Sequence, residues 1–287
     1  MTSETASNAV RAQILTAAVP YIKEYTGKYV VAKYGGNAMT DPELKKSVMQ
    51  DILLLSLVGV KVILVHGGGP DINRMLDRLH IESRFKNGLR ITDGQTMEVV
   101  QMVLAGKVNK SLVADLAAYG GKAIGLSGID GSLLQVRTAD PGLGLVGEIE
   151  KVNTEIIDNA IAGGFIPVIS SVGIDKNGQP HNINADTAAA KIAGALGAEC
   201  MVFMSNIDGV LQDKENPSSL IRKLTLAEVE ALKQDGTIAG GMIPKVDSCT
   251  EAVRNGCKKV FIINGKIPHA ILIELLTDEG LGTMFTP

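Results

Sequence analysis

Three segments of the chain combine glycine with polar residues at points where predicted strands end. Lys33 closes one apolar run and is followed at once by Gly35-Gly36, and the run that ends at His66 continues into three glycines and a proline. The segment NINAD at 182–186 opens a helical stretch. A strand, a glycine-rich turn and a helix N-terminus together present backbone N–H groups to a phosphate or carboxylate. We therefore predict an anion-binding site at the carboxyl ends of these strands.

Other kinds of catalytic site find no support in the sequence. No GxGxxG segment follows a strand, and no Gly-Lys pair is followed by Ser or Thr, which argues against dinucleotide-binding and Walker A loops. The segment around Ser127 lacks the last glycine of a nucleophile elbow, and the protein-kinase motifs are absent. The four histidines are scattered, so no metal site is readable. Chemistry must then rest on Lys, Arg, Asp, Asn and backbone N–H groups, which are the tools of phosphoryl transfer.

The composition is typical of a globular protein with a large core. The chain has 287 residues, of which 45% are hydrophobic and 21% charged, and this excludes disorder over most of its length. A net charge of −3 and an aromatic content of 3% argue against nucleic-acid, anionic-membrane and base-stacking surfaces. The chain shows no secretory signal or bilayer-length apolar run, and Cys200, Cys249 and Cys257 have no disulfide or zinc spacing. We therefore expect a cytoplasmic protein with reduced, mostly buried thiols.

Apolar periodicity predicts that helices and strands alternate along the chain. One amphipathic helix is expected over 10–22, ending before Gly27, and short hairpin strands are expected over 123–152. Further strands are predicted at 29–33, 60–66, 166–170, 201–205, 259–263 and 283–286. Further helices are predicted at 42–59, from 71, at 93–119 with a break near Gly106, and at 153–162, 185–196, 226–235, 244–255 and 268–276. This alternation predicts an α/β fold whose mainly parallel sheet carries helices on both faces.

Five segments of the chain occur in the order and spacing of a known family. They are VAKYGGNA (31–38), VHGGGP (65–70), NGLRIT (87–92), NINAD (182–186) and GGMIPK (240–245). Together they resemble the acetylglutamate kinases of the amino-acid kinase family, from about Gly27 to the C-terminus. The resemblance implies a three-layer αβα sandwich with an open, mainly parallel central sheet. It also implies ATP-dependent phosphorylation of the γ-carboxylate of N-acetyl-L-glutamate, the second step of arginine synthesis.

The resemblance also implies a division of the chain and a set of phosphoryl-binding residues. Within a single kinase domain, 27–180 would bind acetylglutamate and 181–287 would bind ATP. Lys33 and Lys245 match two lysines that flank the transferring phosphoryl group, where each would offset charge on its equatorial oxygens. Asp186 matches the carboxylate that holds both lysines in place. The turn at Gly35 and Gly36 matches a turn under the ATP phosphates.

Four residues match the family's contacts to the amino-acid substrate. Gly68 and Gly69 match backbone donors, and a side chain there would block close approach of the backbone. Arg90 matches the arginine that grips the α-carboxylate, a task for which a guanidinium fork is suited. Asn182 matches a substrate-binding amide.

The nucleotide contacts are less well defined by the resemblance. Asp208 and Gly209 match the ATP-binding segment, but Ser205-Asn206 stand where the family often has Thr-Asp. This departure leaves the polar contacts around the nucleotide open. Mg²⁺ is implied together with ATP, held mostly by phosphate oxygens and water, with no ligand from protein side chains.

The two ends of the chain resemble the arginine-inhibited branch of these kinases. A helix within 1–26 and the tail at 277–284 imply a homohexamer, a trimer of dimers interlaced by the N-terminal helix, with L-arginine bound near the helix and the tail. The alternative is an amphipathic helix packed on its own domain. A PII-type signalling protein is a conceivable further partner that nothing in the sequence indicates. Candidate arginine contacts are Tyr21, His269, Glu274 and Gly280.

Two rival functions stay open from the sequence. One is a kinase of the same fold that acts on glutamate, aspartate, aminoadipate, carbamate or a nucleotide, although Arg90 in its Asn-Gly-Leu-Arg context favours acetylglutamate. The other is a non-catalytic sensor of arginine or a nucleotide. Lys33, Lys245 and Asp186 argue against the sensor, because sensing alone needs no groups that stabilise a transferring phosphoryl.

Overall fold

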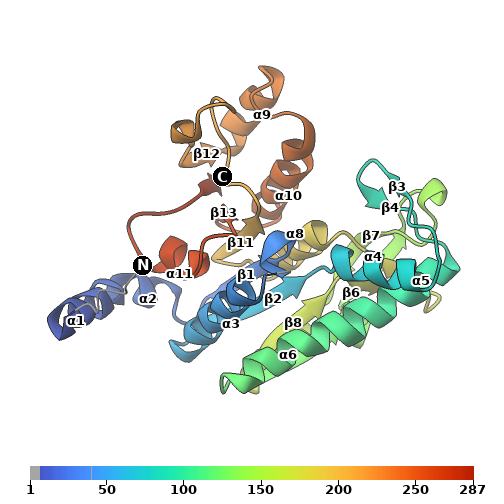
Figure 1. Ribbon diagram of the computed structural model, residues 1–287, viewed down its shortest axis with the longest axis horizontal. Helices are drawn as coiled ribbons and strands as arrows, with labels where there is room; N and C mark the ends of the chain where they lie inside the picture. Colours follow the sequence, from blue (N-terminus) through green and yellow to red (C-terminus); the bar gives the residue numbers. More distant parts are fainter. Residues whose placement is uncertain (1–6, 40) are drawn as a thin grey trace.

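The computed structural model describes residues 7–39 and 41–287, and an eight-stranded sheet runs through the molecule (Figure 1). Its strand order is β12-β14-β13-β11-β1-β2-β8-β5. All neighbouring strands pair in parallel except β13 and β14. This confirms the predicted α/β fold with a mainly parallel sheet. The strands are β1 (Tyr29–Tyr34), β2 (Lys61–His66), β5 (Ala123–Ser127), β8 (Ile166–Ser170), β11 (Cys200–Ser205), β12 (Lys223–Thr225), β13 (Val260–Asn264) and β14 (Thr283–Thr286).

Helices pack on both faces of this sheet and make it the middle of three layers. One face carries α2 (Val19–Tyr25), α3 (Pro42–Leu57), α4 (Gly69–Arg78), α5 (Gly94–Gln101), α6 (Asn109–Ala118) and α11 (Ala270–Leu276). The other face carries α7 (Glu155–Ala162), α8 (Ala185–Ala195), α9 (Leu226–Gln234) and α10 (Ile243–Arg254). Each face has its own apolar core. In β1, Val30 and Ala32 join the first core and Val31 the second, which is the two-residue alternation of a strand buried on both sides.

The order of strands places a crevice beside β1. On one side of β1 the chain continues into β2, and on the other side β1 pairs with β11. In open α/β sheets, ligands bind outside the carboxyl ends of the strands where the strand order reverses. The residues at these ends are Tyr34, His66 and Ser205.

Smaller elements surround the main sheet and correct one prediction. The predicted hairpin over 123–152 is present as β6 (Leu134–Thr138) and β7 (Gly147–Val152), but β5 is no part of it and pairs in parallel with β8 at the sheet edge. The turn residues after Ser127 correctly indicate where the strand ends, but they do not distinguish a strand at the sheet edge from one arm of a hairpin. The other small strands are β3 (Phe85–Lys86), β4 (Leu89–Arg90), β9 (Val172–Ile174) and β10 (Pro180–Asn182), and short 3₁₀ turns are η1 (Gly36–Met39), η3 (Asp130–Ser132), η4 (Pro141–Leu143), η5 (Pro217–Ser219) and η6 (Gly240–Met242).

The N-terminal helix is also a correction, because it is two helices rather than one. α1 (Asn8–Ala17) is capped at its C-terminus by Ala18, and α2 begins at Val19 with Pro20 in its first turn. A proline lacks the N–H that would continue the first helix and is tolerated in the first turn of a new one. α2 buries Tyr25, but α1 buries none of its residues and projects from the body (Figure 1).

The long helical region from Asp93 to Tyr119 is continuous. The Asp93 carboxylate accepts from the N–H of Thr96 at 2.8 Å and caps α5, and the predicted break near Gly106 is a π-helical segment, η2 (Met102–Val108), that leads into α6. π-Helical turns are frequent at functional sites.

The structure also bears on the cysteines and on possible membrane-spanning segments. Cys200, Cys249 and Cys257 are buried and free, as predicted for reduced core thiols. None of the helices over 7–39 and 41–287 is long and apolar enough to cross a membrane.

Candidate active site

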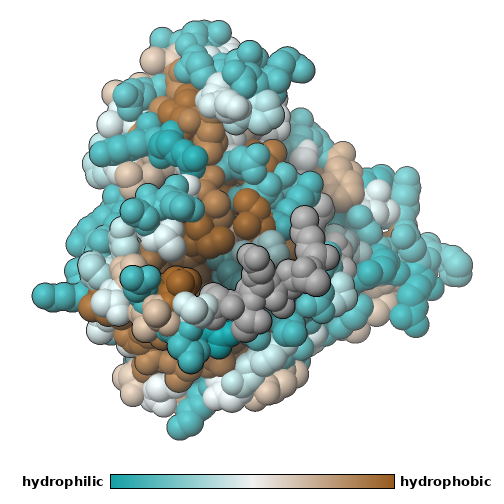
Figure 2. Space-filling view, turned by 60° about the vertical axis from the view of Figure 1, so that its left-hand side comes forward, coloured by the Kyte–Doolittle hydropathy of each residue, from teal (hydrophilic) through white to brown (hydrophobic). Residues whose placement is uncertain are grey.

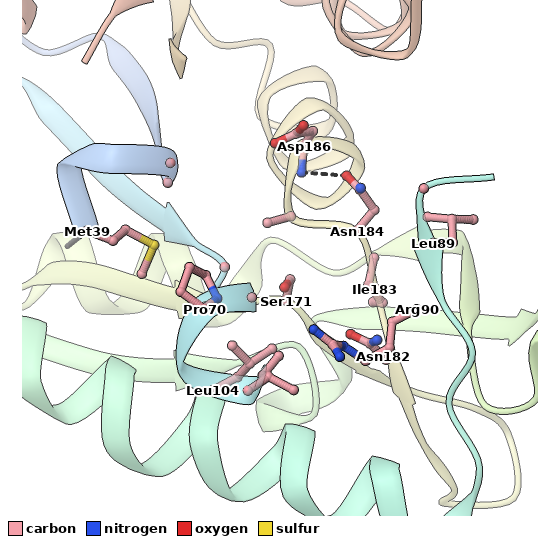
Figure 3. A pocket seen from close by; sticks show the side chains of 18 of the residues that line it. Met39, Pro70, Leu89, Arg90, Leu104, Ser171, Asn182, Ile183, Asn184 and Asp186 are labelled. Atoms are coloured by element: carbon pink, nitrogen blue, oxygen red, sulfur yellow. Dashed lines mark hydrogen bonds between the residues drawn. The ribbon is translucent and has the colours of Figure 1, made fainter. Parts of the chain in front are cut away.

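One cavity of about 240 Å³ opens at the carboxyl ends of β1, β2 and β8 (Figure 3). Its walls come from segments far apart in the sequence, which the parallel sheet brings to a common edge. Eight residues predicted from the sequence line it, namely Lys33, Gly35, Gly36, Gly68, Gly69, Arg90, Asn182 and Asp186.

A partly buried ion pair lies at one end of the cavity. The Nζ atom of Lys33 lies 2.8 Å from Oδ1 of Asp186. Asp186 is in the first turn of α8, which begins because the side chain of Asn184 accepts from the N–H groups of Asp186 and Thr187 at 2.8 and 3.2 Å. The pair fixes the lysine ammonium at the end of β1, at the mouth of the glycine turn that follows.

Lys245 reaches the same neighbourhood from another element. Its Nζ lies 5.6 Å from the centroid of the Phe203 ring, and the Nζ of Lys33 lies 5.0 Å from that centroid. Phe203 is fully buried and is the register partner of Lys33 between β11 and β1. The ring therefore carries both ammonium groups by cation–π attraction.

Asp186 contacts only one of the two lysines that it was predicted to hold. Within the described residues Lys245 forms no ion pair, although α8 and α10 pack together. Burial raises the pKa of the Cys249 thiol. The negative charge of Asp186 adds to this rise and the positive charge of Lys245 opposes it, so both charges lie close to Cys249 on α10. A lysine in the first turn of a helix is opposed by the helix dipole. The ammonium group of Lys245 is therefore stabilised better by an anion bound in the crevice than by its own helix.

A side chain at three of the glycines in the two turns would come very close to neighbouring atoms. A Cβ on Gly68 would lie 2.7 Å from Cδ2 of Leu104, and one on Gly35 would lie 2.5 Å from Nζ of Lys33. Gly36 has φ of +68°, and a Cβ there would lie 2.7 Å from Oδ1 of Asn206. Gly69 has open space around it, but it is the first residue of α4, whose first N–H groups have no partner within the helix. The backbone thus lines the cavity without side chains.

Arg90 and Asn182 lie side by side at the far end of the cavity (Figure 3). The Arg90 side chain donates to Ser83 and, at 2.6 Å, to Oδ1 of Asn73, and it stacks on the Phe85 ring. It is 7% exposed, and burial lowers the pKa of the guanidinium. Among the described residues no carboxylate pairs with it. A buried cation without a protein counter-ion is a binding site for an anion.

Asp208 and Gly209 line a second cavity, of about 370 Å³, and not the first. Oδ1 of Asp208 accepts from the Asn264 side chain at 2.8 Å, and Gly209 packs so closely that a Cβ would lie 2.4 Å from Oγ1 of Thr283. Asn206 lines the second cavity and also touches Gly36 of the first. The two cavities therefore approach each other where Gly36 and Asn206 lie close together.

The four residues predicted to contact arginine lie around α11. The Glu274 carboxylate accepts from the N–H groups of Leu281 and Gly282, the latter at 3.0 Å, and a Cβ on Gly280 would lie 3.7 Å from its Oε1. His269 precedes α11 in a left-handed conformation. α2, which carries Tyr21, packs against α11.

A buried carboxylate ties α11 to α3. Oδ1 of Asp51 lies 2.6 Å from Nδ1 of His269, Asp51 is fully buried, and its Oδ2 atom has no hydrogen-bond partner among the described residues. Burial raises the pKa of Asp51 to about 6, which outweighs the opposing effect of His269. The folded state therefore binds this proton more tightly than the unfolded chain.

We expect Asp51 to make the protein less stable as pH rises from about 4 to about 6. Over that range the folded state must ionise a buried acid that the unfolded chain ionises earlier. Urea unfolding of wild type and Asp51→Asn should show the variant gaining about 2 kcal/mol relative to wild type between pH 4 and pH 7. Asp77→Asn, at an exposed carboxylate of α4, is the matched control. A constant difference between wild type and Asp51→Asn at both pH values would contradict the assignment.

The sequence profile of the amino acid kinase family matches residues 28–264. The chain belongs to the amino acid kinase family. An acetylglutamate kinase from Brachyspira hyodysenteriae is 53% identical over 284 residues, covering 98% of this chain and 99% of that protein. Another from Nostoc sp. is 50% identical over 279 residues, covering 97% and 94%.

This amino acid kinase therefore groups with the acetylglutamate kinases and is a phosphotransferase, as the five segments predicted. Among solved structures, N-acetylglutamate synthase from Neisseria gonorrhoeae, complexed with coenzyme A and N-acetyl-glutamate, has a TM-score of 0.84 and 26% identity, covering 96% of this chain and 63% of that chain. Carbamate kinase from Giardia lamblia bound to AMP-PNP has a TM-score of 0.66 and 18% identity, covering 91% and 98%. The latter likeness shows the fold.

Several residues of the site were not predicted from the sequence. Phe203 joins the two lysines, and Thr92 accepts from the Asn182 side chain at 3.1 Å. Ser171 lines the cavity, and Asn73 holds Arg90. Thr92 stands within the segment NGLRIT and could have been found there. The others carry no local signal, because their roles come from strand register and helix packing.

Proposed function

We propose that this kinase transfers the γ-phosphoryl group of ATP to the γ-carboxylate of N-acetyl-L-glutamate, in the cytoplasm, as a step of arginine synthesis. The observation that carries the substrate assignment is Arg90, a buried guanidinium that pairs with no carboxylate of residues 7–39 and 41–287 and lies at one end of a cavity whose other end holds Lys33. A dicarboxylate fits this arrangement, with its α-carboxylate on Arg90 and its γ-carboxylate near the lysine. The names of the full-length relatives support the same substrate.

The protein groups supply positioning and charge for this transfer. Lys33 and Lys245 would flank the phosphoryl group as it passes between ATP and the carboxylate, and Asp186 would keep Lys33 in place. The N–H groups of the two glycine turns would donate to anionic oxygens. The second cavity, with Asp208 and Gly209, would take the nucleotide.

Mg²⁺ fits the site as an ion that arrives with the phosphates. Mg²⁺ keeps most of its water and needs only one or two carboxylates besides phosphate oxygens. No cluster of three His, Cys, Asp or Glu side chains able to hold a metal occurs within 7–39 and 41–287. The nearby carboxylates, Asp186 and Asp208, are each already held by one protein donor. The ion would neutralise charge on the phosphates as the transfer proceeds.

Two assays together test the substrate. A coupled ADP-release assay with acetylglutamate, and hydroxamate trapping of the acyl phosphate across a panel of glutamate, aspartate, aminoadipate and carbamate, should show turnover of the acetylated acid. Turnover of free glutamate without turnover of acetylglutamate would overturn the proposal. Absence of ADP release with every acid would favour the sensor.

The proposed regulation is feedback inhibition by L-arginine in a homohexamer. α1 presents Val10, Ile14 and Leu15 to solvent, with Leu15 73% exposed, and buries nothing against its own chain. Figure 2 brings this side of the molecule forward and shows hydrophobic surface on it. A second copy of α1 would cover this apolar stripe. Arginine would then bind beside α2 and α11, near Glu274, whose carboxylate suits a guanidinium.

Removing the N-terminal segment tests this regulation. Deletion of 1–26 is expected to abolish arginine inhibition and reduce the hexamer to dimers. Because α2 buries Tyr25, deletion of 1–17 is the milder variant and should have the same effect with less loss of stability. Light scattering measures the assembly, and ADP release with and without arginine measures inhibition. A matched variant, Ile14→Asn with Leu15→Gln, keeps the helix and removes its apolar stripe. A hexamer that survives these changes would contradict the role of α1.

A further inference from the structure

A buried histidine lies directly behind the glycine turn that follows β2. His66 is fully buried, and its Nδ1 atom lies 2.9 Å from the carbonyl oxygen of Gly67. A carbonyl can only accept, so Nδ1 carries the proton and donates. Burial lowers the pKa of His66 to about 4, so the ring is neutral at physiological pH. The transfer chemistry described above uses neither nitrogen of this ring.

The other ring nitrogen is held by a second buried polar residue. Nε2 of His66 lies 3.1 Å from Nδ2 of Asn109, which also lies 2.8 Å from the Val168 carbonyl and 3.1 Å from that of Leu126. These carbonyls belong to β8 and β5, so one amide at the start of α6 contacts three neighbouring strands. The site for this amide is shaped by a glycine, because a Cβ on Gly125 would lie 1.9 Å from Oδ1 of Asn109. Asn109 therefore sets the tautomer and the orientation of His66.

Covalent geometry carries this orientation into the cavity. The C=O of Gly67 and the N–H of Gly68 belong to one peptide unit, and in a trans peptide they point in opposite directions. No cis peptide bond occurs in the described part of the chain. Gly67 and Gly68 both line the cavity, whereas His66 does not. Because the Gly67 carbonyl bonds to the buried imidazole, the Gly68 N–H points away from the core. The same bond keeps the carbonyl oxygen, which would repel an anion, away from the substrate.

We infer that His66 is a positioning residue that aims the Gly68 N–H at the anionic substrate, with Asn109 holding the imidazole. The inference rests on the proposed function for the identity of that substrate. The active atom is Nδ1, which bonds to the Gly67 carbonyl, and not Nε2.

The two nitrogens of His66 can be separated by substitution. Asparagine places its amide nitrogen where Nδ1 stands, whereas glutamine places its amide near Nε2. We expect His66→Asn to keep kcat/KM for acetylglutamate within about 3-fold of wild type. His66→Gln should lower it by about 10- to 100-fold, because a misplaced binding group costs on that scale. The KM for ATP should stay unchanged in both variants.

Melting temperatures separate positioning from packing. Asparagine leaves the larger void and loses the partner of Asn109, so a purely structural role would make His66→Asn the more damaged variant in stability and activity alike. Activity in the opposite order, with His66→Asn the less stable but more active protein, supports the inference. Equal activities of the two variants would overturn it, as would activities that fall in the same order as the melting temperatures. If the wild type used another acid of the panel, the proposed function would fail, and the same comparison with that acid would still decide the role of His66.

Discussion

Replacing Lys245 by alanine is expected to lower kcat by about 10²–10³ with little change in KM for acetylglutamate or ATP. The ammonium sits over Phe203, and among the described residues it has no ion-pair partner. Its charge is therefore free to act on an anion, and most strongly when charge spreads onto the phosphoryl oxygens in the transition state. Steady-state ADP release at varied concentrations of each substrate measures the effect.

Two further variants make the Lys245 experiment specific. Lys223→Ala removes an exposed lysine at β12 in the same half of the chain and should leave kcat unchanged. Lys245→Arg keeps the charge on a bulkier head and should recover part of the lost rate. Near-normal kcat in Lys245→Ala would refute the role assigned to this residue.

Replacing Arg90 by leucine is expected to raise KM for acetylglutamate by about 10²-fold while KM for ATP is unaffected. The guanidinium is buried and held by Asn73 and Ser83, and in the described part of the chain no carboxylate pairs with it, so we expect the substrate to supply its counter-ion. Loss of one partner of a buried charge pair costs about 3 kcal/mol, which corresponds to that factor. Arg90→Lys keeps the charge but loses the fork, and should still raise KM by about 10-fold.

The matched control for Arg90 is Arg137→Leu. Arg137 is exposed and pairs with Glu148 at 2.7 Å on the hairpin of β6 and β7. Because exposed ion pairs contribute little, this change should leave KM for acetylglutamate unaltered. An Arg90→Leu variant whose KM rises for ATP and not for acetylglutamate would reassign this end of the cavity to the nucleotide.

The structure corrects the sequence prediction at two places, the N-terminal helix and β5. Apolar spacing predicts helix over 10–22, and Pro20 could have indicated the break between α1 and α2. Nothing local in 123–127 distinguishes a strand at the edge of the main sheet from one arm of a hairpin. That choice depends on pairing with β8, some forty residues further along the chain.

The sequence by itself determined the alternation of strands and helices, the glycine turns, and the position of Lys33 and of the NINAD segment with Asp186 at points where strands end and helices begin. These follow from local periodicity, backbone freedom and side-chain charge, whereas Arg90 was predicted only from the resemblance to the acetylglutamate kinases. Only the tertiary structure decided that Phe203 carries two ammonium groups, that Asp208 faces a second cavity, and that His66 lies behind the turn at Gly67. Strand order and register set these contacts, and both depend on how distant segments bury their apolar faces together.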